Sequence, residues 1–232
     1  MARLEGRDAG GEVAQQQELV RRAVQGEVTS SQVVDLFLGV AAALLIALGA
    51  VAAPPGTLDA VKNGLADVSY TVHGYTPGRF VLTQMGELPF LGNSAETISV
   101  AFSRVTAKHP EFAAEHPGVK VLTLFTHGPG IVFNTKRAIT KVDDLAGLKF
   151  RVGGGMVNEI SKALDMNVTL KPAPDSYELL SSGVMDGTLF PAESTDSFKI
   201  DKIIKHGTQF PGGLYNTSFV FMMNPAKYNA LS

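Results

Sequence analysis

The sequence predicts an α/β protein built from two similar lobes, and three observations support this prediction. Of the 232 residues, 45% are hydrophobic and 18% are charged, which is typical of a globular protein with a buried core. Helix-like and strand-like patterns alternate along the chain after residue 53. A pattern of helix, glycine, two residues, aspartate and strand occurs twice, with Gly64 and Asp67 in one copy and Gly183 and Asp186 119 residues later. Two copies of one junction indicate two similarly built lobes.

The first copy of this pattern begins at Thr57, a suitable N-cap for a helix. The dipeptide Asn63-Gly64 is expected to end that helix, and the alternating run Val68–Val72 predicts a strand. The apolar face expected to pack on the core consists of Leu58, Val61 and Leu65.

The elements between the two copies also alternate. A helix is predicted from Ser94 or Ala95 to Lys108, because apolar residues recur at helical spacing and Pro110 ends the pattern. Its apolar face is expected to consist of Ile98, Ala101, Phe102 and Val105. The β-forming run Val119–Phe125 predicts the next strand. A short helical turn at Asp143–Gly147 then precedes a strand at Lys149–Val152.

The second copy follows another helix and strand. Periodic apolar residues predict a helix at Met156–Leu164, and a short β-forming run predicts a strand at Asn167–Leu170. The second copy itself predicts a helix at Tyr177–Gly183 and a strand at Gly187–Phe190. The remaining predicted elements are the strand Ser218–Asn224 and the helix Pro225–Leu231, which has proline in its first turn.

Residues 1–53 differ in composition and are predicted to be a separate, atypical segment. Residues 36–53 form an uncharged run of 18 residues, which predicts an apolar helix. As a helix this run spans about 27 Å, slightly less than a bilayer core of roughly 30 Å. A signal sequence with small residues at Ala50-Val51-Ala52, a membrane tether and a buried alanine-rich helix all remain open, because Asp35 stands where a signal has basic residues.

Composition and motifs exclude several function classes. The 20 basic and 22 acidic residues nearly cancel, so a nucleic-acid partner is not expected. The chain has no cysteine, and its five histidines lack metal-ligand spacing, so neither a metal site nor a cofactor is expected. After Gly153–Gly155, Asn158 replaces the last glycine of a dinucleotide fingerprint. The stretch Glu18–Leu36 is similar to the N-terminal helix of amidase-signature hydrolases, but it carries no catalytic group.

Arg151 is the first candidate for ligand binding. It alternates with Phe150 and Val152 in a strand, and Gly153–Gly155 leads into a helix whose first amides are expected to point outward. A guanidinium at this place suits a ligand carboxylate, because its planar fork can donate two parallel hydrogen bonds. Spacing alone favours the simpler alternative, an exposed arginine in a surface ion pair.

Aromatic and acidic residues follow strand ends at comparable places. Tyr75 follows the strand of the first copy, Phe190 and Glu193 follow that of the second, and Tyr215 precedes the last strand. Ligands of open α/β sheets bind where chain segments leave the strands on one side. We therefore predict that these four residues bind the ligand together with Arg151. His127, in a Gly-Pro-Gly loop, is interpreted as a turn residue.

Six motifs, in the same order, resemble those of the solute-binding proteins of TRAP (tripartite ATP-independent periplasmic) transporters. They are Leu58–Asp67, Tyr75–Phe80, Glu87–Phe90, Leu145–Val152, Leu179–Pro191 and Phe219–Tyr228. The resemblance covers residues 55–232, about three quarters of the chain.

The resemblance implies a truncated two-lobe fold of the type II periplasmic-binding-protein kind, in which two interleaved α/β lobes close on a small organic acid. Parts of lobe 1 are expected around residues 54–125, lobe 2 around 126–215, and a return strand at 218–224, within a solute-binding region at 54–232. The resemblance also implies that Arg151 clamps the ligand carboxylate. Phe190 occupies a position where some members have a ligand-bonding asparagine, so its ring is expected to pack on the ligand.

The expected function is capture of a small organic acid in the periplasm and its delivery to the membrane permease subunits of a TRAP transporter. A monocarboxylate with an apolar body is favoured, because Phe190 and Tyr215 offer more surface than charge. No enzymatic activity is expected. The chain is expected to be incomplete at both ends relative to this family, so a membrane-tethered or non-binding fragment is one alternative. An amidase-like hydrolase is another.

Overall fold

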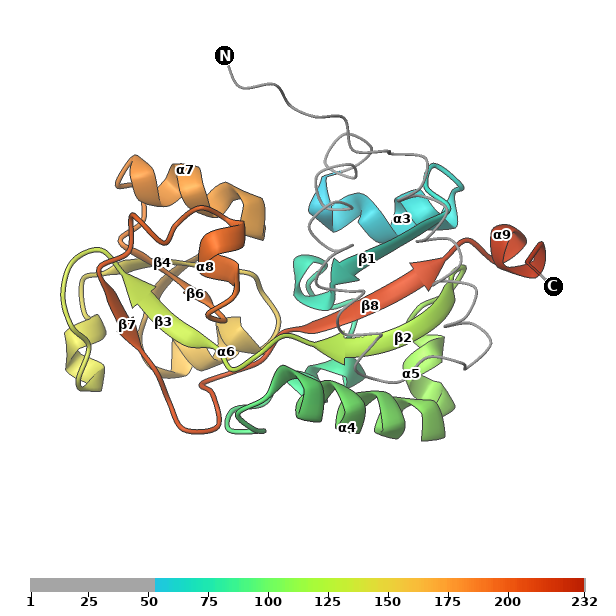
Figure 1. The fold of residues 1–232 in the computed structure, drawn as a ribbon, viewed down its shortest axis with the longest axis horizontal. Coiled ribbons are helices and arrows are strands. Elements are labelled where there is room, and N and C mark those ends of the chain that lie inside the picture. The colour runs from blue at the N-terminus through green and yellow to red at the C-terminus, as the bar shows by residue number, and fades with distance from the viewer. Residues whose placement is uncertain (1–52, 232) are drawn as a thin grey trace, which may run out of the picture.

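The structure is a computed structural model that describes residues 53–231, and it contains two β-sheets in two lobes that lie side by side (Figure 1). The α/β fold predicted from the sequence is confirmed. The apolar helix predicted over residues 36–53, apart from Ala53, and the amidase-like stretch at 18–36 lie outside the described residues.

The first lobe is built on a three-stranded antiparallel sheet, which we call sheet A, with the order β1-β8-β2. Its strands are β1 (Val68–Val72), β2 (Lys120–Thr126) and β8 (Ser218–Met223). The strand β8 therefore comes from the end of the described chain and lies between two strands from its beginning, which interleaves the two ends of the chain in one lobe.

The second lobe is built on a five-stranded mixed sheet, sheet B, with the order β5-β4-β6-β3-β7. Its strands are β3 (Ile131–Asn134), β4 (Lys149–Val152), β5 (Asn167–Leu170), β6 (Gly187–Phe190) and β7 (His206–Thr208). The central strand pairs β4·β5 and β4·β6 are parallel, whereas β3 runs antiparallel to both β6 and β7. Parallel neighbours place the ends of β4 and β6 at the same edge of the sheet, where Arg151 and Phe190 lie.

The duplicated junction forms the same local structure in both lobes. The helices α3 (Thr57–Lys62) and α7 (Ser176–Ser181) end before Gly64 and Gly183, whose φ angles are 74° and 75°. Glycine is favoured there because other residues are strained at positive φ. One detail was wrong: Leu65, expected on the buried face, is 69% exposed, because it follows the glycine and lies outside the helix.

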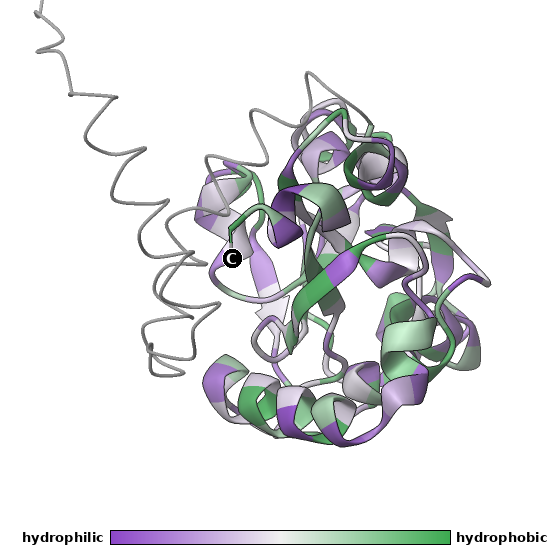
Figure 2. Cartoon of the chain, turned by 90° about the vertical axis from the view of Figure 1, so that its right-hand side faces the viewer, coloured by the Kyte–Doolittle hydropathy of each residue, from purple (hydrophilic) through white to green (hydrophobic). Residues whose placement is uncertain are grey.

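The longer helices match the prediction closely. The helix α4 covers Ala95–Lys108, and its N-cap Ser94 accepts a hydrogen bond from the amide of Thr97. Ile98 and Phe102 are buried as expected, but Ala101 is exposed and Ser99 takes its place. The predicted helix at 156–164 is present as α6 (Met156–Ala163). The predicted helix at 225–231 is present as the shorter α9 (Pro225–Asn229). Helix ribbons in Figure 2 carry hydrophilic and hydrophobic bands in turn, as expected for helices that pack on a sheet by one face.

Several short elements were missed. The strands β3 and β7 were not predicted, although the equally short strands β4, β5 and β6 were. The unpredicted helices are α5 (Pro110–Ala114), α8 (Ser194–Ser197) and the 3-10 turns η1 (Pro54–Gly56), η2 (His73–Tyr75), η3 (Leu82–Glu87) and η5 (Ala173–Asp175). The turn predicted at 143–147 is present as η4 (Val142–Leu145). Thr57 is the first residue of α3, and Gly56 is its N-cap.

Two chain segments cross between the lobes and pair with each other (Figure 1). The first, residues 127–130, joins β2 to β3, and the second, residues 209–217, joins β7 to β8. Backbone hydrogen bonds link His127 to Thr217 at 3.3 Å and Gly130 to Tyr215 at 2.8 Å. A Cβ atom on Gly130 would overlap the ring of Tyr215, so glycine is needed for this close approach.

Each lobe has its own hydrophobic core. The core of the sheet A lobe includes Leu58, Phe102 and Met222, and that of the sheet B lobe includes Phe150, Val152 and Tyr215. Within residues 53–231, no helix is both long and apolar enough to cross a membrane.

We expect Gly130→Ala to lower the melting temperature and to disturb both crossing segments. The added methyl group would overlap the ring of Tyr215, and overpacking of this kind costs about 1–3 kcal/mol. The control is Gly147→Ala, where a Cβ atom would meet nothing within 4 Å and only the strain of φ 76° is added. Differential scanning calorimetry of both variants checks this, and an equal or smaller loss for Gly130→Ala would contradict it.

A buried histidine pair should make the protein sensitive to mild acid. The Nε2 atoms of His73 and His116 are 2.9 Å apart, and each residue is only 2% exposed. Burial lowers the pKa of His73 from 6.5 to about 3, and it lowers the pKa of His116 too. The unfolded chain therefore takes up protons near pH 6.5, whereas folded His73 does so only near pH 3. Stability is lost as the pH falls through this window, by up to about 1.4 kcal/mol per pH unit for each histidine.

The variant His73→Gln should lose less stability than the unchanged protein between pH 7 and pH 5, because glutamine does not titrate. Urea unfolding at pH 7, 6 and 5 measures the difference, with His206→Gln as a control at a half-buried histidine. If the free energy of unfolding of the His73 variant and that of the unchanged protein fall in parallel with pH, the lowered pKa of His73 is not the cause of the acid sensitivity.

Candidate functional site

Arg151 is buried between the two lobes. It lies on β4, and its neighbours Phe150 and Val152 point to the opposite side, into the core of the sheet B lobe. Its side chain is only 2% exposed, and its Nε atom donates to the carbonyl oxygen of Lys171 at 2.7 Å. The alternative interpretation of Arg151 as an exposed residue in a surface ion pair is therefore wrong.

The guanidinium forms no ion pair in the described part of the chain, although Asp175 acts on it electrostatically. The ion pairs found there involve other cations, and none includes Arg151. Burial lowers the pKa of Arg151, and the nearby hydroxyl groups of Tyr75 and Tyr215 act in the opposite direction. A buried cation is costly unless an anion or several hydrogen bonds compensate it, so this position suits a bound anion.

Tyr75 reaches Arg151 from the other lobe. It is the last residue of η2, which follows β1 of sheet A. Its hydroxyl oxygen accepts a hydrogen bond from the amide of Ala173, in η5 of the sheet B lobe, at 2.9 Å. Tyr75 thus spans the two lobes next to the guanidinium, and only a tertiary contact could reveal this.

Phe190 has a different environment from the one expected. Its ring lies under the guanidinium of Arg151, with Cζ 4.7 Å from the ring centroid, and it also stacks on Phe198 at 5.2 Å. Only 5% of Phe190 is exposed. The ring therefore packs on the arginine, where it can hold the guanidinium in place by a cation–π contact.

Tyr215 and Glu193 complete the predicted set. Burial raises the pKa of Tyr215, and Arg151, Glu193 and Tyr75 all lie close enough to act on it electrostatically. The Glu193 carboxylate accepts a hydrogen bond from the amide of Gly128 at 3.2 Å, which ties it to the first crossing segment. The structure thus brings the five predicted residues together, with the guanidinium of Arg151 and the phenols of Tyr75 and Tyr215 at the centre.

His127, interpreted from the sequence as a turn residue, lies in the first crossing segment, against the site. Its ring meets that of Tyr215 edge to face, with centroids 5.5 Å apart. Burial lowers the pKa of His127 to about 4, although Gly128 and Glu193 oppose this. The ring is therefore neutral at pH 7, and Arg151 is the cation of this site.

Two further residues were missed. Glu87 is 1% exposed and hydrogen-bonded to both lobes, although it appeared in the sequence only as part of a motif. Asn216, next to Tyr215, is fully buried, and within residues 53–231 neither atom of its side-chain amide has a hydrogen-bond partner. The motif that contains Glu87 gave no indication of its role, and no motif pointed to Asn216, because the environment of both residues depends on how the lobes meet. Across the same described range, no group of acidic or histidine side chains could hold a metal ion.

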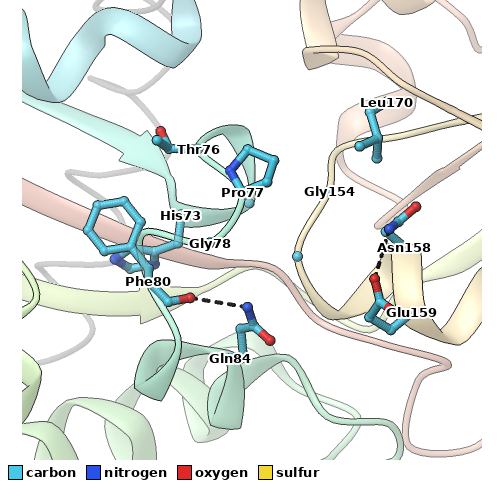
Figure 3. Close-up of a pocket in the computed structure, with 12 residues that line it drawn as sticks. His73, Thr76, Pro77, Gly78, Phe80, Gln84, Gly154, Asn158, Glu159 and Leu170 are labelled. Atoms are coloured by element: carbon cyan, nitrogen blue, oxygen red, sulfur yellow. Dashed lines mark hydrogen bonds between the residues drawn. The ribbon is translucent and has the colours of Figure 1, made fainter.

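A pocket of about 290 Å³ adjoins this site at the boundary of the lobes (Figure 3). One wall carries His73, Phe80 and Gln84, and the other carries Asn158 and Leu170. The walls approach most closely at Gly74 and Gly154, where a side chain on either glycine would overlap the other backbone. Gly74 directly precedes Tyr75, and Gly154 follows Arg151 by three residues. The pocket therefore lies beside the predicted site.

Comparison with known proteins identifies a family match over most of the chain. Residues 45–232 match the family described as "Bacterial extracellular solute-binding protein, family 7". The match begins inside the apolar run 36–53, before the boundary at 54 that was expected from the sequence.

Individual relatives agree with this match. An outer membrane transporter protein, TsaT, from Comamonas testosteroni is 32% identical over 81% of this chain and 56% of its own length. A TRAP periplasmic solute-binding protein from Bordetella bronchiseptica, solved with bound (R)- and (S)-mandelate, is 48% identical with a TM-score of 0.76, over 78% of this chain and 58% of its own.

A marine-metagenome TRAP solute-binding protein described as specific for aromatic acids was solved with 3-hydroxybenzoate. It is 37% identical with a TM-score of 0.73, over 78% of this chain and 57% of its own. The chain therefore spans somewhat more than half the length of these relatives.

Proposed function

The chain belongs to family 7 of the bacterial extracellular solute-binding proteins, and from this we propose that it captures a small aromatic monocarboxylate. The observation that supports this most is the guanidinium of Arg151, which is buried between two lobes and forms no ion pair in the described part of the chain. A ligand carboxylate would supply the missing negative charge.

The surroundings of Arg151 support an aromatic rather than a highly polar ligand. Tyr75, Phe190 and Tyr215 surround the guanidinium with aromatic surface. Glu193 lies near the Tyr215 hydroxyl, so a second carboxylate on the ligand would meet a negative charge. The two solved relatives described above hold mandelate and 3-hydroxybenzoate, which are both aromatic monocarboxylates.

We assign different roles to the five predicted residues. Arg151 clamps the carboxylate, and Tyr75 and Tyr215 provide aromatic surface for the ring of the ligand. Phe190 acts indirectly, because its ring supports the guanidinium and is almost fully buried. Glu193 limits the number of negative charges that the ligand can carry.

We further propose that the protein works in the periplasm and delivers its ligand to the permease subunits of a TRAP transporter. In this proposal, residues around 54–125 with the return strand 218–224 form one lobe, and residues around 126–215 form the other. This division is supported by the strands of each sheet, because β1, β2 and β8 form sheet A and β3 to β7 form sheet B. Closure of the two lobes would bury the ligand and present one continuous surface to the permease.

Isothermal titration calorimetry with four compounds tests the proposed ligand class. We expect (R)-mandelate and 3-hydroxybenzoate to bind, and succinate to bind much more weakly or not at all. Mandelamide is the matched control, because it keeps the ring and the hydroxyl group of mandelate but has no carboxylate. Binding of succinate without binding of either aromatic acid would overturn the proposal.

The variant Arg151→Lys should bind mandelate about 10-fold to 150-fold more weakly. An ammonium keeps the charge but cannot donate two parallel hydrogen bonds, and one charge-assisted bond contributes about 1.5–3 kcal/mol. The control is Arg137→Lys, because the exposed Arg137 also donates to backbone carbonyls in the sheet B lobe, away from the site. Equal dissociation constants for Arg151→Lys and the unchanged protein would remove Arg151 from the site.

A further inference from the structure

Glu87 lies where the two lobes and the second crossing segment meet. It is the last residue of η3, and its side chain is 1% exposed. Its Oε1 atom accepts hydrogen bonds from the amide of Ser218 at 3.0 Å and from the Ser218 hydroxyl at 2.7 Å. Its Oε2 atom accepts a hydrogen bond from the amide of Met156 at 2.8 Å.

These hydrogen bonds join parts of different lobes. Ser218 begins β8 of sheet A, whereas Met156 begins α6, which follows β4 of sheet B. The carbonyl oxygen of Glu87 also accepts a hydrogen bond from the amide of Asn216, in the second crossing segment. One residue thus contacts sheet A, the crossing segment and the first turn of a helix in the other lobe.

The contact with α6 is close and needs glycine. Gly155, directly before Met156, has a φ of 73°, and a Cβ atom there would overlap Oε2 of Glu87. Residues 153–155 connect this helix to Arg151, and a Cβ atom on Gly153 would lie 3.6 Å from the guanidinium. The position of the first turn of α6 therefore affects the path of residues 153–155, which follow the strand that carries Arg151.

A buried network fixes Glu87 from the other side. Hydrogen bonds run in line from Glu87 to Ser218, His73 and His116, and end at the carbonyl oxygen of Phe112. Burial raises the pKa of Glu87, although the hydrogen bonds from Met156 and Ser218 oppose this, and burial lowers the pKa of His73. The hydrogen bonds from Met156 and Ser218 satisfy both carboxyl oxygens of Glu87, which allows the group to remain buried.

We propose that Glu87 is a positioning residue for ligand binding: it holds the first turn of α6 against the crossing segment and so sets the place of Arg151 relative to Tyr75. This inference rests on the proposed function for its ligand, but the role of Glu87 in joining the lobes can be measured without any ligand.

The primary variant is Met156→Pro, which removes the amide hydrogen that Glu87 accepts. Proline is well tolerated at the first position of a helix, so the fold should persist. The matched control is Ala95→Pro, at the first position of α4 in a single lobe. A second pair is Glu87→Ala with Glu115→Ala, because Glu115 also accepts backbone amides around η3, from Val81, Leu82 and Thr83, but within one lobe.

Three readouts separate positioning from simple stability. Calorimetry with (R)-mandelate should give a dissociation constant about tenfold or more higher for Met156→Pro and Glu87→Ala, and an unchanged one for both controls. Melting temperatures should fall no further for the test variants than for their controls. Pulsed EPR between labels at Lys108→Cys and Glu178→Cys should give a broader interlobe distance for the test variants, even without ligand, and the absence of native cysteine makes this labelling specific.

The possible results separate this inference from the proposed function. Unchanged affinity and an unchanged interlobe distance in both test variants would overturn the positioning role, as would equal weakening in the controls. If the unchanged protein binds no aromatic acid, the proposed function fails, and the ligand-free distance measurement still decides the role of Glu87. If Glu87→Ala does not fold, Met156→Pro alone gives the answer.

Discussion

The pairing of two crossing segments is the constraint on which the rest of this structure depends. Residues 127–130 and 214–217 run between the lobes and are hydrogen-bonded to each other, so each lobe meets the other in one defined way. Gly130 allows the ring of Tyr215 to lie directly against the first segment. Because His127 and Tyr215 belong to these segments, the crossing segments also form one side of the candidate site.

The buried guanidinium gives this site its chemical character. Removing Arg151 from water is costly, and the described chain compensates this cost only in part, with the carbonyl of Lys171, two phenol groups, the ring of Phe190 and the electrostatic effect of Asp175. Among the described residues, no carboxylate forms an ion pair with this guanidinium. A site of this kind is preorganised for an anion, because the cation is already dehydrated and held in a fixed orientation before the ligand arrives.

Hydrogen bonds between buried side chains hold the boundary of the two lobes. The side chains of Glu87, Ser218, His73 and His116 form one linked set. Hydrogen bonds of this kind are directional, so they fix the relative orientation of η3, β8 and α6 more strictly than apolar packing would. Orientation matters here because the residues that surround the guanidinium come from both lobes.

The sequence alone determined the local elements and the candidate residues, and the tertiary structure decided what those residues do. Gly64 and Gly183 could be recognised because a helix end that needs positive φ depends on only a few neighbouring residues. Residues near strand ends, such as Arg151, could be chosen because strand ends collect at one edge of a sheet. By contrast, the burial of Arg151, the stacking of Phe190 beneath it and the interlobe contacts of Glu87 result from segments more than 35 residues apart in the chain. Such contacts depend on how the two lobes pack, and local sequence patterns carry no information about that packing.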